Sequence, residues 1–182
     1  GPFEGATVKI DATGKIVVAT GACPQGQGHE TVFAQVTADL WKVPIEDVYV
    51  TVADTAHVTM GYGTLASRST VTASGAIQLA SDQIKEKAFS IASEILETGE
   101  QDLELRDSGV GVKGVPGMHI SFRDIATAAR PGWGHKRPEG IDAGLEATSY
   151  YEPPTVTWAY AANAAIVEVN PGTGQVLIEN YV

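Results

Sequence analysis

Short runs in which apolar and polar residues alternate open the chain, and a period of two is typical of β-strands. Two such runs, residues 6–10 and 15–20, flank the turn sequence Asp11-Ala-Thr-Gly14 and predict a β-hairpin. A third run at 47–53 predicts another strand. The first part of the chain is therefore expected to build a sheet.

Two other stretches carry apolar residues at helical spacing. The first covers about residues 30–41, and we expect its apolar face to consist of Val32, Phe33, Val36 and Leu40. The second covers about residues 69–96, where many alanines allow close packing against a sheet. The face expected to be buried in this long helix consists of Ala73, Ile77, Ala80, Ile84, Ala88, Ile91 and Ile95.

The second half of the chain alternates turns with short strands. Hairpins are predicted at 103–115 and at 160–182, a strand at 145–151, and a short helix that starts after Ser121 and ends near Arg130. This order predicts an α+β fold, in which helices pack on mixed or antiparallel sheets with several β-hairpins. We expect one unit over 1–182, with two lobes at about 1–98 and 99–182 as a finer division.

Composition narrows the classes of partner. The 182 residues carry a net charge of −10, which argues against a nucleic acid or an anionic membrane surface as partner. No apolar run approaches the roughly 18 residues that span a bilayer, and no targeting segment is visible, so we expect a cytoplasmic protein. The single cysteine, Cys23, excludes an intrachain disulfide, and we expect a buried, inert thiol.

The histidines do not suggest a metal centre. They are His29, His57, His119 and His135, and no two stand at metal-ligand spacing. We expect surface or capping roles for them, and we assign no metal ligand and no catalytic residue to this chain.

A glycine-rich loop between a strand and a helix is the first feature that suggests chemistry. It contains Gln25, Gly26, Gln27 and Gly28. Unpaired N–H groups and the helix dipole favour an anion at such a helix start, and glycines let the backbone approach a phosphate. A tight turn with solvated glutamines is the alternative.

The start of the long helix is the second such feature. Ser67, Ser69 and Thr70 cluster there beside Arg68, whose guanidinium offers a fork of donors. This arrangement predicts a second anion site. The alternative is that one hydroxyl residue caps the helix and that Arg68 forms a surface ion pair.

Taken together, the two loops resemble a known family. The segments Gln25-Gly-Gln-Gly-His-Glu-Thr31 and Gly61-Tyr-Gly-Thr-Leu-Ala-Ser-Arg-Ser-Thr70, in this order and separation, are similar to those of the molybdenum hydroxylases. That family includes xanthine dehydrogenase, aldehyde oxidoreductase and the large chain of aerobic carbon monoxide dehydrogenase. The resemblance extends over most of the chain from Ala6 onward.

The resemblance implies a fragment or split piece of a molybdopterin-binding subunit. It implies molybdopterin, in its cytosine dinucleotide form, as the cofactor of the full enzyme, and partners that carry iron–sulfur centres and FAD besides the remainder of the subunit. The reaction implied is hydroxylation of an aldehyde, an N-heterocycle or a carbon monoxide-like substrate with oxygen from water. The cofactor-binding residues that the resemblance implies are Gln25, Gly26, Gln27, Gly28, Thr64, Ala66, Ser67, Arg68, Ser69 and Thr70.

The chain also departs from a complete family member. The Gly-Glu motif that supplies the base near the end of the family's subunit is missing, and so is the substrate-side loop. We therefore expect the chain to bind part of a cofactor and to be inactive by itself.

Two alternatives belong to other classes of protein. The order strand, Gly26-Gln-Gly28, helix, strand, Asp54 is similar to a nucleotide-binding βαβ unit, in which Asp54 would meet a ribose. Against it, Thr31 occupies the position of the third glycine. The other alternative is a non-catalytic interaction domain whose glycine loops are only turns.

Overall fold

The computed structural model describes residues 3–132, 137–138, 140–156, 158 and 160–182. The helices are α1 (His29–Trp41), α2 (Ser69–Leu96) and α3 (Phe122–Ala128). The strands are β1 (Glu4–Ile10), β2 (Ile16–Thr20), β3 (Val48–Val52), β4 (Leu103–Arg106), β5 (Gly109–Val112), β6 (His119–Ser121), β7 (Glu146–Tyr151), β8 (Ala165–Val169) and β9 (Val176–Tyr181). This is the α+β fold that the sequence predicts.

The main sheet has the strand order β3-β2-β1-β7. β1 pairs antiparallel with β2 and with β7, whereas β2 and β3 are parallel, so the sheet is mixed. The predicted first hairpin is confirmed, and its register places Val8 opposite Val18. Because α1 connects the parallel strands β2 and β3, the glycine-rich loop lies at the carboxyl end of β2, which is where α/β units place ligands.

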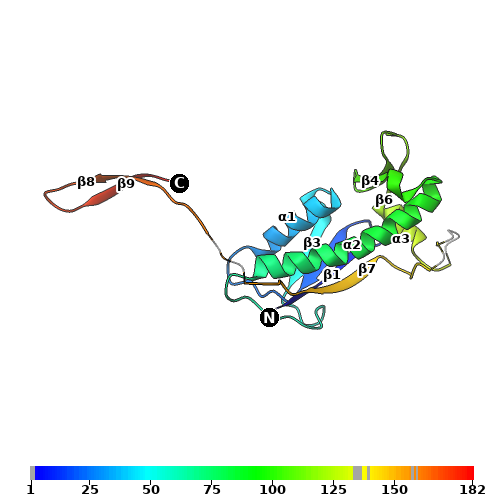
Figure 1. Ribbon diagram of the computed structural model, residues 1–182, viewed down its shortest axis with the longest axis horizontal. Coiled ribbons are helices and arrows are strands. Elements are labelled where there is room, and N and C mark those ends of the chain that lie inside the picture. Colours follow the sequence, from blue (N-terminus) through cyan, green and yellow to red (C-terminus); the bar gives the residue numbers. More distant parts are fainter. Residues whose placement is uncertain (1–2, 133–136, 139, 157, 159) are drawn as a thin grey trace.

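The long helix α2 packs on β1 and β7, with α1 beside it (Figure 1). Of its expected face, Ala73, Ile77, Ala80, Ile84, Ala88 and Ile91 are buried. Ile95 is 37% exposed, which was not expected. At that end α2 has reached the second sheet, and Leu96 packs against the core instead of Ile95.

The buried face of α1 differs from the prediction. Only Phe33 of the four expected residues is buried, and the fully buried line is His29, Phe33, Thr37 and Trp41. These residues are spaced by four and form one stripe along the helix. The helix packs against both α2 and β3, so the half-buried Val32 and Leu40 flank this stripe.

A second sheet, β4-β5-β6, lies at the far end of α2 together with α3 (Figure 1). Ser121 caps α3, because its Oγ accepts the N–H of Asp124 at 3.2 Å, as the capping pattern predicts. One hydrophobic core continues from Val8 in the main sheet to Phe122 and Ile125 in α3. A division near residue 98 stays a prediction, and it would separate β7 from its partner β1.

The predicted C-terminal hairpin forms from β8 and β9 and projects away from the body (Figure 1). Its apolar side chains are exposed, among them Ile166 at 61% and Leu177 at 59%. None of the helices among the described residues is long and apolar enough to cross a membrane.

Candidate functional site

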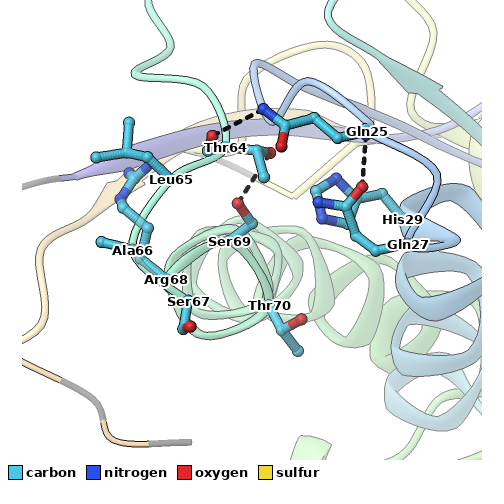
Figure 2. Close-up of a pocket in the computed structure, with 10 residues that line it drawn as sticks. All are labelled: Gln25, Gln27, His29, Thr64, Leu65, Ala66, Ser67, Arg68, Ser69 and Thr70. Atoms are coloured by element: carbon cyan, nitrogen blue, oxygen red, sulfur yellow. Dashed lines mark hydrogen bonds between the residues drawn. The ribbon is translucent and has the colours of Figure 1, made fainter.

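A pocket of about 400 Å³ lies between the glycine-rich loop and the start of α2 (Figure 2). The amide Nε2 of Gln25 joins the two sides by donating to the carbonyl oxygen of Thr64 at 3.2 Å. The residues that line the pocket are Gln25, Gln27, His29, Thr64, Leu65, Ala66, Ser67, Arg68, Ser69 and Thr70. Eight of the ten expected site residues thus meet at one pocket, and the other two are Gly26 and Gly28.

The backbone of the glycine-rich loop requires its glycines. Gly26 and Gly28 have φ angles of 93° and 73°, in the left-handed region that other residues rarely adopt. A Cβ atom added at either position would meet nothing within 4 Å, so the loop surface is open there. Gly28 is the N-cap of α1 and supplies no side-chain cap, which leaves N–H groups of the first turn available to an anion.

The second loop is strained at the edge of the pocket. Ala66 and Ser67 have φ angles of 53° and 55°, a conformation that costs about 1–2 kcal/mol for each non-glycine residue. Such outliers gather where function requires a particular backbone shape. The strain therefore supports a ligand-binding role for this turn.

The alternative in which a hydroxyl residue caps α2 is wrong. Arg68 occupies the N-cap position and makes no side-chain cap hydrogen bond there. The Ser69 hydroxyl donates instead to Oγ1 of Thr64 at 3.0 Å (Figure 2). Because no side chain caps α2, N–H groups of its first turn are available to an anion.

Arg68 is not a surface residue, and of its guanidinium nitrogens only the buried Nε has no hydrogen-bond partner. It is 4% exposed, and its Nη1 and Nη2 atoms donate to the carbonyl oxygens of Gly63 and Phe3. The buried carboxylate of Glu4 lies 3.6 Å from Nη1. The ion pair, which the alternative placed at the surface, is thus a buried one, and Glu4 is a residue that the sequence pattern did not single out.

His29 is a second residue that was missed, because a surface or capping role was expected for it. It is 3% exposed, lines the pocket, and packs its ring against Phe33 at 5.3 Å between centroids. Its Nδ1 atom is buried without a hydrogen-bond partner. The i, i+4 spacing of His29 and Phe33 on the inner stripe of α1 was the signal available in the sequence.

The remaining candidates lie away from this pocket. Cys23 is exposed, so the prediction of a buried thiol is wrong, because the residue stands in the loop that follows β2. Asp54 lines a different pocket, and its carboxylate accepts the Ala56 N–H and pairs with His57 at 3.0 Å. These hydrogen bonds, that of Ala56 first, lower the pKa of Asp54.

A metal centre made of this chain's own side chains does not appear in the described part of the chain. No group of three or more His, Cys, Asp or Glu residues gathers there. His135 lies outside the described residues.

The pocket's chemistry fits the phosphate-bearing end of a cofactor. It offers two open glycine positions, uncapped starts of two helices, two side-chain amides and several hydroxyl groups. Neutral donors of this kind bind phosphate oxygens, and the amides can also hydrogen-bond a heteroaromatic ring. The unpartnered Nδ1 of His29 shows that the site's hydrogen-bonding capacity is not fully used.

Comparison with known proteins agrees with this chemistry. The family model of the molybdopterin cofactor-binding domain matches residues 1–182. The carbon monoxide dehydrogenase large chain of Hydrogenophaga pseudoflava is 35% identical over 181 residues, which is 100% of this chain and 22% of that protein. The nicotine 6-hydroxylase large subunit of Paenarthrobacter nicotinovorans is 36% identical over 96% of this chain and 21% of its own length.

Solved structures that are similar to this chain belong to the same group of enzymes as these relatives. Quinoline 2-oxidoreductase from Pseudomonas putida 86 superposes with a TM-score of 0.84 at 36% identity, covering 99% of this chain and 23% of that one. The chain thus spans about a fifth of the length of the relatives that it matches. With the matched model, these likenesses show that the chain belongs to the molybdopterin cofactor-binding domain family of the molybdenum hydroxylases.

Proposed function

We propose that the pocket between the glycine-rich loop and the start of α2 binds the phosphate-bearing part of molybdopterin, in its cytosine dinucleotide form. The observation that carries this proposal is the meeting of two uncapped helix starts at one pocket, joined by the hydrogen bond from Gln25 to Thr64. Two such starts place two sets of N–H donors and two positive dipole ends around the same volume, which favours an anion with more than one phosphate.

Each expected site residue has a role in this proposal. Gly26 and Gly28 let phosphate oxygens approach the backbone, and the amides of Gln25 and Gln27 bind a phosphate or the edge of a ring. Ala66 shapes the turn, and Arg68 holds it through hydrogen bonds to the carbonyl oxygens of Gly63 and Phe3. The hydroxyl donors are those of Thr64, Ser67 and Thr70, and Ser69 orients the Thr64 hydroxyl by donating to its Oγ1 atom.

We infer further that the chain works as part of a larger oxidoreductase. The bound molybdenum group would supply the two-electron oxidation that hydroxylates a substrate with oxygen from water. The names of the relatives suggest carbon monoxide or an N-heterocycle as substrate, and an aldehyde stays in the proposal from the family resemblance. The remainder of the subunit and partners with iron–sulfur centres and FAD complete the proposed enzyme, which is cytoplasmic, and the chain alone would be inactive.

Titration with two nucleotides tests the cofactor proposal. The full chain is titrated by calorimetry with cytidine 5′-diphosphate and, separately, with NAD, and the loop amides are followed by NMR. Saturable binding of cytidine 5′-diphosphate that shifts the amides of Gly26, Gly28 and Ser69 is the expected result. Binding of NAD alone would favour the βαβ alternative. Binding of neither nucleotide would contradict a preformed dinucleotide site.

A further inference from the structure

The carboxylate of Glu4 lies where the two pocket loops begin, although Glu4 does not line the pocket. Its side chain is fully buried at the start of β1, and its Oε2 atom accepts the N–H of Tyr62 at 3.3 Å. Gly21 and Gly61 approach each other so closely that a Cβ added at Gly61 would lie 2.6 Å from the Cα of Gly21 and 3.0 Å from Oε1 of Glu4. Gly21 leads into the glycine-rich loop, and Gly61 leads into the second loop. The carboxylate of Glu4 therefore lies beside the backbone at which both loops begin.

Arg68 completes this arrangement from the pocket side. One guanidinium nitrogen donates to the carbonyl oxygen of Phe3, and another donates to that of Gly63 and lies 3.6 Å from Oε2 of Glu4. The guanidinium also stacks 5.1 Å from the centre of the Tyr62 ring. Each Nη atom therefore donates to a backbone carbonyl oxygen, the buried Nε has no hydrogen-bond partner, and the charge of Glu4 offsets the positive charge of the guanidinium.

We propose that Glu4 and Arg68 form a positioning pair that fixes the second loop against the first, and that Arg68 does not contact the ligand. This inference rests on the proposed function, and it replaces the cofactor-binding role that the family resemblance implies for Arg68. A buried ion pair with one member removed leaves an uncompensated charge, so neither residue can be replaced without disturbing the loops. The strained turn at Ala66 and Ser67, directly before Arg68, is the backbone that the pair holds in place.

The variant Glu4→Gln separates a positioning role of Arg68 from direct contact with the ligand, because the two hypotheses predict opposite changes in the affinity for an anion. If Arg68 bound phosphate directly, loss of the competing carboxylate would strengthen binding of an anion. If the pair positions the loops, the same change weakens binding. We expect the Kd of cytidine 5′-diphosphate to rise about 5- to 30-fold, the range that one lost interaction of moderate strength produces.

The dependence of Kd on salt supplies a second readout. A residue that pairs with phosphate contributes to the slope of log Kd against log salt concentration, because salt screens that contact. We expect the double variant Glu4→Met with Arg68→Met, which removes both buried charges, to raise Kd and leave this slope unchanged. This variant also carries the test if Glu4→Gln does not fold, since apolar replacement of a buried pair is often tolerated. The control is Glu86→Gln on the exposed side of α2, which should leave Kd unchanged.

The outcomes distinguish this inference from the proposed function. If the unaltered chain does not bind cytidine 5′-diphosphate, the proposed function fails. If it binds, and Glu4→Gln binds equally or more tightly, the positioning pair is overturned. A shallower salt slope in the double variant would overturn it as well, by showing that Arg68 meets the anion. A lowered melting temperature with unchanged Kd would show that the pair only stabilises the fold.

Discussion

The indole Nε1–H of Trp41 donates a hydrogen bond to the Ser81 hydroxyl at 3.0 Å in the buried contact between α1 and α2. Both side chains are fully buried, and the Trp41 ring also meets Phe122 of α3 edge-on at 5.5 Å between centroids. The last residue of α1 is thus tied to the two other helices. Since α1 begins at the glycine-rich loop, this contact at its far end helps to hold the helix that presents the loop.

Ser81→Ala should lower the stability of the fold. It leaves the buried indole N–H without an acceptor, which costs about 1–3 kcal/mol. At about 2–4 °C per kcal/mol for a chain of this size, the melting temperature should fall measurably. Ser74→Ala on the same helix is the matched control, because the buried Ser74 Oγ has no hydrogen-bond partner. An equal loss of stability in both variants would show that the Trp41–Ser81 bond contributes little.

Gly75→Ala should destabilise the chain although alanine is the better helix former. A Cβ at this position would lie 2.6 Å from Cγ of the Tyr151 ring on β7. The clash should cost about 1–3 kcal/mol, which exceeds or offsets the gain in helix propensity of about 1 kcal/mol. Adding Tyr151→Val should restore stability relative to the single variant. Chemical unfolding of both variants tests this, and a single variant more stable than the unaltered chain would refute the prediction.

Gln27→Ala should weaken ligand binding more than it weakens the fold. The Oε1 atom of Gln27 accepts the backbone N–H of Gln25, and the side chain lines the pocket from an exposed loop. If the amide meets the ligand, its loss leaves a polar partner unsatisfied at about 1–3 kcal/mol, or roughly 5- to 150-fold in affinity. Calorimetry with cytidine 5′-diphosphate gives the Kd, and Gln35→Ala on the exposed side of α1 is the control. An unchanged Kd with a lower melting temperature would mean that the loop is a structural turn.

The ion pair between Lys15 and Asp47 should make stability depend on pH in the alkaline range. It ties the first hairpin to the turn before β3, and the hydrogen bond from Lys15 to Asp47 raises the pKa of Lys15 above its ordinary value of 10.5. Because the folded-state pKa is raised, the contribution is complete below pH 10.5 and is lost as pH rises through the higher folded value.

Unfolding by urea at a series of pH values from 8 to 11.5 tests this. Lys15→Met should be less stable than the unaltered chain at the lower pH, and the difference should shrink as the pH rises. Asp47→Asn should behave in the same way, and the double variant should add little to either change. A difference in stability that is constant over the whole range would contradict the prediction.

Local patterns in the sequence determined most of the secondary structure. The turn Asp11-Ala-Thr-Gly14, the helical spacing over residues 69–96 and the cap at Ser121 act within a few residues, so they can be recognised without knowing the fold. The two motifs of the pocket could be recognised for the same reason. Turns and helix starts of this kind require glycines and small hydroxyl residues at particular positions of the local backbone.

Which side chains are buried in the core was decided only by the tertiary structure. Val32, Val36 and Leu40 are apolar, yet the stripe through His29, Thr37 and Trp41 is the buried one, because α1 packs against α2 and β3 together. Cys23 is exposed and Arg68 is buried, the reverse of what each residue type suggests. Burial depends on neighbours that are distant in sequence, and no local pattern contains them.

The same distinction applies to the site. The two loops could be predicted from the sequence. Only the fold shows that Gln25 contacts Thr64 and that Glu4 contacts Arg68, although these two residues are 64 positions apart in the chain. A lone glutamate in a β-strand carries no signal of its own. It acquires one when α2 packs on β1 and β7, because the start of α2 then lies at the start of β1 and the guanidinium of Arg68 meets the carboxylate of Glu4.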